Sequence, residues 1–429
     1  MGKYFGTDGI RGKANEKLTA SLALKVGESL ALIDEKDVII AGDTRVSTDM
    51  LISAVCAGAL SVGKNVILAG KVSTPCLMFA SRHFHTIGIM ITASHNPYYD
   101  NGIKVVKYGK KILNDEQALI ENYIDGNITI NKSNIGEIKQ ALVTEEYIKY
   151  LKSLNVKSDL KIAIDAANGA TYKLAEAVFS RYGAYITNNC PDGYNINNNV
   201  GSTHLESIIN TTKGKYDLGF AFDGDGDRIM VVDKNGYIYD GDKILYVLAN
   251  YFAKKNKLNK KTVVLTKMCN LGIINSLKDI NIDVDVTDVG DKYVLESMEK
   301  NDFSLGGENS GHIITPYSNT GDGILVGLLI LMVLDEEKKT LEELTKTIEM
   351  YHDKMVNIPV NNKAIINNDE LNNRIKEIEN DLGKYGKVIL RASGTENLIR
   401  VSVMAKDQEV QLKYLDELVS MVNNLNQEG

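Results

Sequence analysis

The sequence predicts an α/β protein with three similar α/β domains, whose sheets are mixed and mainly parallel, followed by a smaller α+β C-terminal domain. Two observations indicate this fold class. At 429 residues the chain is too long for one ordinary hydrophobic core. In addition, short apolar runs alternate with helical periods three times along the chain. We expect domains at residues 1–150, 151–250, 251–356 and 357–429.

The first repeat contains apolar strands expected at residues 38–42, 66–69 and 87–91, with a helix near 47–61. Residues 58–64 match the GxxxxGK pattern of a phosphate-binding loop. However, Asn65 replaces the hydroxyl residue that would bind magnesium, and a strand follows this segment instead of preceding it. We therefore interpret the segment as a helix that ends at Gly63.

The second and third repeats have the same order of elements. The second has strands expected at 162–165, 184–187 and 218–222 and a helix at 170–182; the third has strands at 263–266, 284–287 and 303–306 and a helix at 271–277. A polar segment follows the third strand of each repeat: residues 93–97, 223–228 and 307–312. Open α/β sheets bind ligands at the carboxyl ends of their strands, so each segment is a candidate ligand-binding loop.

The first two of these loops indicate phosphoryl transfer. Residues 92–97 (TASHNP) present the hydroxyl of Ser94 on a tight turn after an apolar strand. Residues 223–228 (DGDGDR) present three carboxylates, and the intervening glycines allow the backbone to fold tightly around a cation. A serine that can carry phosphate, beside a site for a hard divalent metal, is typical of a phosphoryl-transfer enzyme.

Other interpretations of these two loops are weaker. The aspartate spacing resembles an EF-hand, but Arg228 stands where that loop needs glycine and Lys234 where it needs glutamate. A solvated acidic loop remains an alternative, although three carboxylates after an apolar strand would repel one another strongly without a cation. His95 forms no hydrolase triad with its neighbour Ser94, since no G-x-S-x-G elbow is present. We expect His95 to bind phosphate oxygens or to shape the turn.

The C-terminal segment predicts a phosphate-binding turn. Helices expected at 369–381 and 408–425 flank a strand–turn–strand at 388–404. Hydroxyls, a glycine-exposed backbone and two arginines can surround a phosphate, although an ordinary hairpin is the alternative. The residues expected to hold the phosphate are Arg391, Ser393, Gly394, Thr395 and Arg400.

Composition limits the classes of partner. A net charge of -7 argues against general binding to nucleic acid or to a membrane surface. The polar, glycine-rich start predicts no signal peptide. The longest apolar run, residues 324–334, is roughly half of what spans a bilayer, so we expect a buried core helix there. The cysteines form no CxxC pair, which predicts buried, reduced thiols in a cytoplasmic protein. They are Cys56, Cys76, Cys190 and Cys269.

Four motifs in this order resemble those of the α-D-phosphohexomutase superfamily, and they span nearly the whole chain. They are residues 92–97, 223–228 and 307–312 (GENSGH) and the turn that begins at Arg391. Within the superfamily the sequence is most similar to the bacterial phosphoglucosamine mutase subgroup, through residues 5–12, 195–197, 201–204 and 289–294. It departs from that subgroup at four positions. Lys292 replaces an arginine, Asn309 a glutamine, and Ala392 and Asn397 two prolines.

The resemblance implies an intramolecular phosphotransferase that interconverts glucosamine 6-phosphate and glucosamine 1-phosphate for UDP-N-acetylglucosamine synthesis. Its active site would lie in the central cleft. A phosphoserine at Ser94 would give its phosphoryl group to the sugar, forming a 1,6-bisphosphate, and would then recover the other one. One Mg²⁺ would be bound by Asp223, Asp225, Asp227 and Ser94. Alternatives are a phosphoglucomutase or phosphomannomutase, a phosphoserine-dependent phosphatase, and a non-catalytic phosphosugar-binding protein.

The resemblance also implies further roles. Lys104, Arg11 and Arg228 would balance the charge of the phosphoserine, and Lys104 is one candidate for moving the hydroxyl proton. His312 is the other candidate, and Glu308 and Ser310 would bind sugar hydroxyls. Glucosamine or glucose 1,6-bisphosphate would act as activator. The expected partner is a small sugar phosphate, neither nucleic acid nor a membrane, and the resemblance suggests a homodimer.

Overall fold

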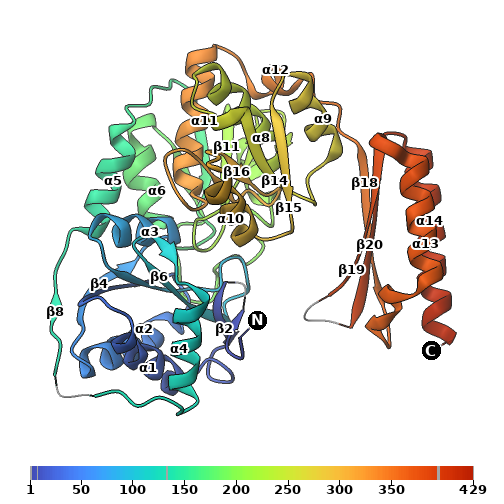
Figure 1. Cartoon of the computed structure of the whole chain (residues 1–429). Helices are drawn as coiled ribbons and strands as arrows, with labels where there is room; N and C mark the ends of the chain where they lie inside the picture. Colours follow the sequence, from blue (N-terminus) through green and yellow to red (C-terminus); the bar gives the residue numbers. More distant parts are fainter. Residues whose placement is uncertain (1, 7, 132–133, 394–396, 429) are drawn as a thin grey trace. The chain divides into compact units, whose positions relative to one another are not determined.

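A computed structural model of the chain describes residues 2–6, 8–131, 134–393 and 397–428. The chain divides into two compact units (Figure 1). The first unit comprises Met1–Lys267 and Asp285–Leu344, and the second comprises Met268–Val284 and Thr345–Gly429. Mixed sheets combined with helices confirm the predicted α/β class. The four domain boundaries expected from the sequence stay a prediction.

The first sheet has a parallel centre and an antiparallel side. The pairs β5–β3, β3–β4 and β4–β8 are parallel, and the pairs β1–β2, β2–β6 and β6–β5 are antiparallel. The strand order is β1 (Phe5–Gly6), β2 (Gly9–Lys13), β6 (Asp100–Lys107), β5 (Ile87–Ile91), β3 (Asp37–Gly42), β4 (Asn65–Lys71) and β8 (Ile138–Lys139), with β7 (Lys110–Lys111) paired to β6.

Helices cover both faces of this sheet, which explains why its central strands are apolar throughout. Ile87 and Ile89 of β5 face the core formed with α1 (Ala20–Ser29), α2 (Thr48–Ser61) and α4 (Asn114–Ile124). Gly88 points to the opposite face, where a Cβ atom would lie 3.3 Å from Leu77 of α3 (Thr74–His83). The next helix, α5 (Val143–Ser153), packs against α3.

The second sheet follows the same plan. Its strand order is β10 (Tyr185–Thr187), β9 (Ile162–Asp165), β11 (Leu218–Phe222), β12 (Ile229–Asp233) and β13 (Ile238–Tyr239). The first two pairs are parallel and the last two antiparallel. The helices of this part of the chain are α6 (Tyr172–Phe179), α7 (Glu206–Thr212) and α8 (Gly241–Lys254).

The third sheet is shorter, with the order β15 (Asp283–Thr287), β14 (Thr262–Thr266), β16 (Gly306–Gly307) and β17 (Ile313–Ile314). The helices of this stretch are α9 (Leu271–Asp279), which belongs to the second unit, α10 (Asp291–Asn301), α11 (Gly323–Glu337) and α12 (Leu341–Thr345). The long apolar run lies in α11 and is buried, as predicted. Among the described residues, no helix combines the length and apolar character needed to cross a membrane.

The structure locates the antiparallel strands of the mixed sheets, which the sequence interpretation expected but did not place. The third strand of each repeat is followed by a return strand, namely β6, β12 or β17. Each of the three polar loops is therefore a turn between antiparallel strands. Two expected boundaries were wrong. The helix expected at 170–182 ends at Phe179 and continues as a 3₁₀ turn, and the strand expected from Phe303 begins at Gly306.

The second unit contains an antiparallel sheet with the order β18 (His352–Pro359), β20 (Leu398–Ala405) and β19 (Gly386–Ala392). Its core includes residues of α13 (Asp369–Leu382) and α14 (Gln408–Glu428), the two helices that the sequence predicts. Strand β18 was not predicted because most of its side chains are exposed, so it lacks the alternation of a half-buried strand.

One expectation about the cysteines was wrong. Cys56, Cys76 and Cys269 are buried thiols outside any disulfide, but Cys190 is exposed. Cys190 lies in the loop after β10, outside helix and strand, so no neighbouring element covers it.

Candidate active site

Ser94 lies in the turn between β5 and β6 and is only 2% exposed. Its backbone has a φ of +53°, in the left-handed region, which costs a non-glycine residue roughly 1–2 kcal/mol. The Ser94 amide donates to Thr92 Oγ1 at 2.9 Å, and the Ser94 hydroxyl donates to Asp223 Oδ2 at 2.7 Å. A strained serine whose hydroxyl faces an acidic loop is typical of a functional site.

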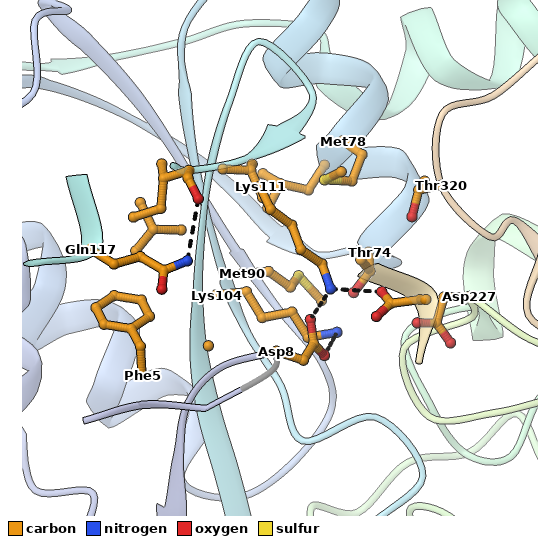
Figure 2. A pocket seen from close by; sticks show the side chains of 16 residues that line it. Phe5, Asp8, Thr74, Met78, Met90, Lys104, Lys111, Gln117, Asp227 and Thr320 are labelled. Carbon is orange, nitrogen blue, oxygen red and sulfur yellow. Dashed lines mark hydrogen bonds and ion pairs between the residues drawn. The ribbon is translucent and has the colours of Figure 1, made fainter. Parts of the chain in front are cut away.

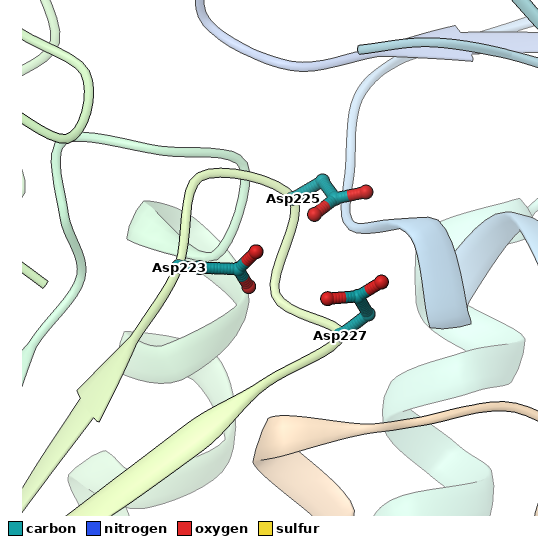
Figure 3. Close-up of side chains that lie close together, drawn as sticks. All are labelled: Asp223, Asp225 and Asp227. Atoms are coloured by element: carbon teal, nitrogen blue, oxygen red, sulfur yellow. The ribbon is translucent and has the colours of Figure 1, made fainter. Parts of the chain in front are cut away.

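The acidic loop gathers its carboxylates around one point. Asp223, Asp225 and Asp227 are buried, and one ligand oxygen from each lies within 4.8 Å of the others. Figure 3 shows Asp223 and Asp227 pointing toward each other across the loop. Gly226, with a φ of +74°, permits the tight turn, and its amide donates to Asp223 Oδ1 at 3.1 Å.

The electrostatics of this loop fit a bound cation. Burial and the neighbouring carboxylates raise the pKa of Asp223 and Asp227. Burial also acts to raise the pKa of Asp225, but the charge of Lys104 and a 2.5 Å hydrogen bond from Thr74 outweigh it and lower that pKa. Among the described residues, buried oxygens of Asp225 and Asp227 have no hydrogen-bond partner. A hard divalent cation would supply that partner and offset the repulsion. In their chemistry and spacing, the three aspartates could therefore hold a divalent metal ion.

Lys104 lies beside the acidic loop as part of an ion-pair network. Its Nζ is 2.9 Å from Asp8 Oδ2 and 3.0 Å from Asp225 Oδ2. Lys111 extends the network, at 3.0 Å from Asp8 and 2.7 Å from Asp291 (Figure 2). Burial acts to lower the pKa of Lys104, but the charges of Asp225 and Asp8 outweigh it and raise that pKa. Lys104 therefore remains an ammonium ion at neutral pH.

Two predicted arginines and one histidine line the same cleft as Asp227 of the acidic loop. Arg228 Nε is 3.8 Å from Asp227 Oδ1, and Arg11 donates to Asp8 Oδ2 at 2.6 Å. His312 Nε2 accepts a hydrogen bond from the Gly321 amide at 3.2 Å. That bond assigns the imidazole proton to Nδ1, a buried atom that has no partner in the described part of the chain.

The third loop supplies Glu308 and Ser310. Glu308 Oε1 accepts a hydrogen bond from the Gly290 amide at 3.0 Å, which fixes the carboxylate. The buried Ser310 hydroxyl makes no hydrogen bond to any described residue. At Gly311 a Cβ atom would lie 2.1 Å from the Ile229 carbonyl oxygen, so only glycine allows this loop to approach the start of β12, directly after the acidic loop, so closely.

One cleft joins six of the predicted residues. Burial and the charges of Arg228 and Arg11 lower the pKa of His95 to about 4, so this side chain is neutral at physiological pH. His95 lines a second pocket, beside the cleft. Lys104 lines a third cavity together with Asp8 and Lys111 (Figure 2). The predicted residues that line the cleft itself are Arg11, Ser94, Asp227, Arg228, Glu308 and His312.

The second unit contains the remaining predicted residues. Arg391 and Arg400 are direct cross-strand partners on β19 and β20. Burial and the charge of Arg400 lower the pKa of Arg391. Like charges directly opposite each other are unfavourable unless an anion binds between them. The Ser393 carbonyl accepts a hydrogen bond from Lys363 Nζ at 2.7 Å, whereas Gly394 and Thr395 lie outside the described residues. The phosphate assignment stays a prediction.

Sequence reasoning missed several residues that complete the site. Asp8 binds Arg11, Lys104 and Lys111, and Asp291 binds Lys111. Both aspartates fall in segments that carried the family resemblance, residues 5–12 and 289–294. Asp8 could have been found from its position three residues before Arg11, a spacing that allows the two side chains to pair.

Comparison with known families accounts for nearly the whole chain. Four family models match in order, and all belong to phosphoglucomutase/phosphomannomutase. Alpha/beta/alpha domain I matches residues 2–130, domain II 145–236, domain III 240–351 and the C-terminal domain 355–421.

Curated relatives match over the full length. A phosphoglucosamine mutase of Caldicellulosiruptor bescii is 42% identical, over 99% of this chain and 99% of the relative. A phosphoglucosamine mutase of Shouchella clausii is 40% identical, over 98% of this chain and 99% of the relative.

Solved structures share the fold. A phosphoglucomutase/phosphomannomutase family protein from Burkholderia thailandensis superposes with a TM-score of 0.82 at 23% identity, covering 99% of this chain and 98% of that one. An N-acetylphosphoglucosamine mutase from Aspergillus fumigatus, solved in complex with GlcNAc-6P and magnesium, gives a TM-score of 0.70 at 18% identity, covering 99% and 96%. The chain therefore belongs to the phosphoglucomutase/phosphomannomutase family of phosphohexomutase enzymes, and within it to the phosphoglucosamine mutases.

Proposed function

We propose that this enzyme interconverts glucosamine 6-phosphate and glucosamine 1-phosphate by way of a phosphoserine at Ser94. The phosphoryl group on Ser94 Oγ passes to the free hydroxyl of the sugar phosphate, whose proton is released, and a 1,6-bisphosphate forms. After the bisphosphate turns over in the cleft, its other phosphoryl group returns to Ser94 Oγ. Each transfer breaks one P–O bond and forms another, so no phosphate is lost.

One observation carries this proposal. The Ser94 hydroxyl, on a strained turn, donates at 2.7 Å to one member of a buried three-carboxylate cluster. A serine without a phosphoryl role would have no need for this cluster. A metal site without a phosphoryl role would have no need for a strained serine at its edge.

The charged residues around the serine have consistent roles. Arg11 and Arg228 line the cleft, where their guanidinium groups can bind phosphate oxygens. Lys104 is held protonated by Asp8 and Asp225, which suits it to donate a hydrogen bond or a proton, not to remove one. His312 presents its Nδ1 proton, and Glu308 has its other carboxylate oxygen available for a sugar hydroxyl.

Asp223, Asp225 and Asp227, together with a phosphate oxygen on Ser94, would hold one Mg²⁺, which when bound neutralises negative charge in the transition state. Glucosamine or glucose 1,6-bisphosphate would phosphorylate Ser94 in enzyme that lacks the group. The Arg391–Arg400 pair would hold the phosphate that is not reacting. A homodimer remains an expectation from the family resemblance.

The amino-sugar preference rests on the curated phosphoglucosamine mutases, which are about 40% identical to this chain. The test is kcat/KM for glucosamine 6-phosphate, glucose 6-phosphate and mannose 6-phosphate, with release of inorganic phosphate recorded in parallel. We expect glucosamine 6-phosphate to give the highest value and phosphate release to be minor. A higher value for glucose or mannose 6-phosphate would assign a hexose mutase, and stoichiometric phosphate release would assign a phosphatase.

A further inference from the structure

A buried arginine lies directly behind the serine loop. Arg45 follows β3 at the same sheet edge from which the serine loop leaves β5, and the whole residue is 1% exposed. Its Nε is 2.8 Å from Asp43 Oδ2, and both side chains of this ion pair are fully buried. An arginine with no access to solvent has to place every donor on a protein acceptor.

The acceptors of Arg45 are the backbone carbonyls of the serine loop. One terminal nitrogen donates to the carbonyl oxygens of Ser94 and Asn96, each at 2.8 Å, and the other donates to the carbonyl of Pro97. These contacts fix three peptide groups of the loop relative to β3. The planar guanidinium can reach them together because its donors have a fixed fork geometry, which a lysine ammonium lacks.

Asp43 holds the beginning of the same loop. Its Oδ2 accepts a hydrogen bond from Thr92 Oγ1 at 2.6 Å, and Thr92 Oγ1 in turn accepts from the Ser94 amide at 2.9 Å. Asp43 Oδ1 accepts from Thr48 Oγ1 and from the Arg45 amide, each at 3.0 Å. The amide side of Ser94 is therefore fixed by Asp43 through Thr92, and its carbonyl side by Arg45.

The loop is also held from the second sheet's side. Asn197 Nδ2 donates to the Ser94 carbonyl at 2.9 Å and to the Asn96 carbonyl at 3.2 Å. With its amide and carbonyl groups held in this way, Ser94 adopts the left-handed backbone conformation. In that conformation its hydroxyl points at Asp223.

We propose that the Asp43–Arg45 pair is a positioning device for phosphoryl transfer, which fixes Ser94 Oγ against the metal-binding carboxylates. Neither residue contacts those carboxylates in any hydrogen bond or ion pair of the described structure, so the pair acts through the loop. This inference rests on the proposed function of Ser94. Loss of a merely structural ion pair would lower only the stability of the protein. Loss of a positioning pair would also slow phosphoryl transfer, while the affinity for the metal stays unchanged.

The test compares Arg45→Lys with Val55→Ala in the full-length enzyme. Arg45→Lys keeps the charge beside Asp43 but cannot hold three carbonyls, and Val55→Ala removes volume from the core of the same part of the chain. For Arg45→Lys we expect kcat, and the rate of Ser94 phosphorylation by glucose 1,6-bisphosphate, to fall by about a hundredfold. The KM and the Kd for Mg²⁺ should change by no more than about twofold. Val55→Ala should lower Tm and leave both rates within about twofold.

Thr92→Val provides an independent test that does not depend on folding of the arginine variant. It removes the hydroxyl between Asp43 and the Ser94 amide with little change in shape, and we expect about a tenfold loss of both rates. Wild-type rates in Thr92→Val or in folded Arg45→Lys would overturn the inference. If wild-type enzyme itself never acquires phosphate on Ser94, the proposed function fails, and that result is distinct from failure of the Asp43–Arg45 inference.

Discussion

The serine loop (residues 92–97) and the acidic loop (residues 223–228, called the metal loop below) meet at one hydrogen bond but are stabilised in opposite ways. The serine loop is held from outside, by side chains such as Arg45 and Asn197 that bind its carbonyls. Among the described residues, no buried side-chain nitrogen or oxygen of this loop lacks a hydrogen-bond partner. The metal loop brings three buried carboxylates together, and two of them retain oxygens without a hydrogen-bond partner in the described structure. Protein groups alone hold the first loop, whereas under the proposed function the second loop requires a bound cation to balance its carboxylates.

The serine loop thus contributes mainly geometry to the site, and the metal loop contributes mainly negative charge. A change in the serine loop should alter transfer with little dependence on the metal. A change in the metal loop should alter stability in opposite directions with and without the metal. Each of the following substitutions tests one side of that distinction.

The largest effect is expected for Ser94→Ala. Loss of the nucleophile should lower kcat by more than about a thousandfold, since no other group can carry the phosphoryl group. The Tm should change little, because the side chain makes few contacts and alanine shares the backbone strain. Activity is measured with a coupled assay on glucosamine 6-phosphate. Retention of more than about a hundredth of wild-type kcat would show that Ser94 is not the carrier.

Asp227→Asn tests the metal loop. Without metal, the variant should be more stable than wild type by about 1 kcal/mol or more, because a buried, poorly compensated carboxylate becomes neutral. With excess Mg²⁺ the order should reverse, and kcat should fall by roughly a hundredfold. Thermal unfolding in chelator and in Mg²⁺ measures both. An unchanged order of Tm in the two conditions would exclude a cation at these aspartates.

Arg400→Ala changes a residue of the second unit and serves as the comparison with the two loops of the first unit. We expect kcat/KM to fall by roughly ten- to a hundredfold, the value of a charge-assisted contact to phosphate, at unchanged Mg²⁺ affinity. The loss should be similar for 1-phosphate and 6-phosphate substrates. The ratio of phosphate released to sugar isomerised should rise. Wild-type values of kcat/KM and of this ratio would make the hairpin merely structural.

The smallest expected effect is a change in the pH dependence of stability on substitution of Asp322, which precedes α11, the helix that contacts the metal loop. Gly323 at the start of α11 donates to the Gly226 carbonyl at 3.0 Å, and Asp322 caps this helix through the Leu325 amide. Burial raises the pKa of Asp322 to about 6, above its ordinary value of 3.8, although hydrogen bonds, including one of 2.8 Å from Tyr147, favour the ionised form.

The sign of the pH dependence follows from that shift. The folded state retains a proton on Asp322 that the unfolded state releases between about pH 4 and 6, so wild-type stability falls as pH rises through this window. Asp322→Asn keeps a capping side chain and removes the titration. Its stability relative to wild type should rise by about 2 kcal/mol from pH 4.5 to 7.5. Urea unfolding of both proteins measures this difference, and a pH-independent difference would contradict it.

The sequence predicted the functional loops better than the residues that hold those loops in place. Strand periodicity placed the three loops at equivalent strand ends, so Ser94 and the aspartates were identified from local pattern alone. Asp43 and Arg45 were not identified from the sequence, because their partners in the serine loop lie about 50 residues away. Only the pairing of β3 with β5 brings these residues and the loop together. The left-handed conformation of Ser94 also has no local signature, since it is imposed by those distant contacts. For a similar reason β18, with its exposed side chains, was recognised only through its pairing with β20.

The most direct test of the central claim is the phosphorylation state of Ser94 during turnover. The peptide containing Ser94 is analysed by mass spectrometry before and after one equivalent of glucosamine 6-phosphate is added, while the sugar products are quantified. A phosphoserine mechanism requires that a phosphorylated fraction of Ser94 is present at the start and that its loss is matched by formation of a sugar bisphosphate. Full mutase turnover by enzyme whose Ser94 never carries phosphate would contradict this mechanism.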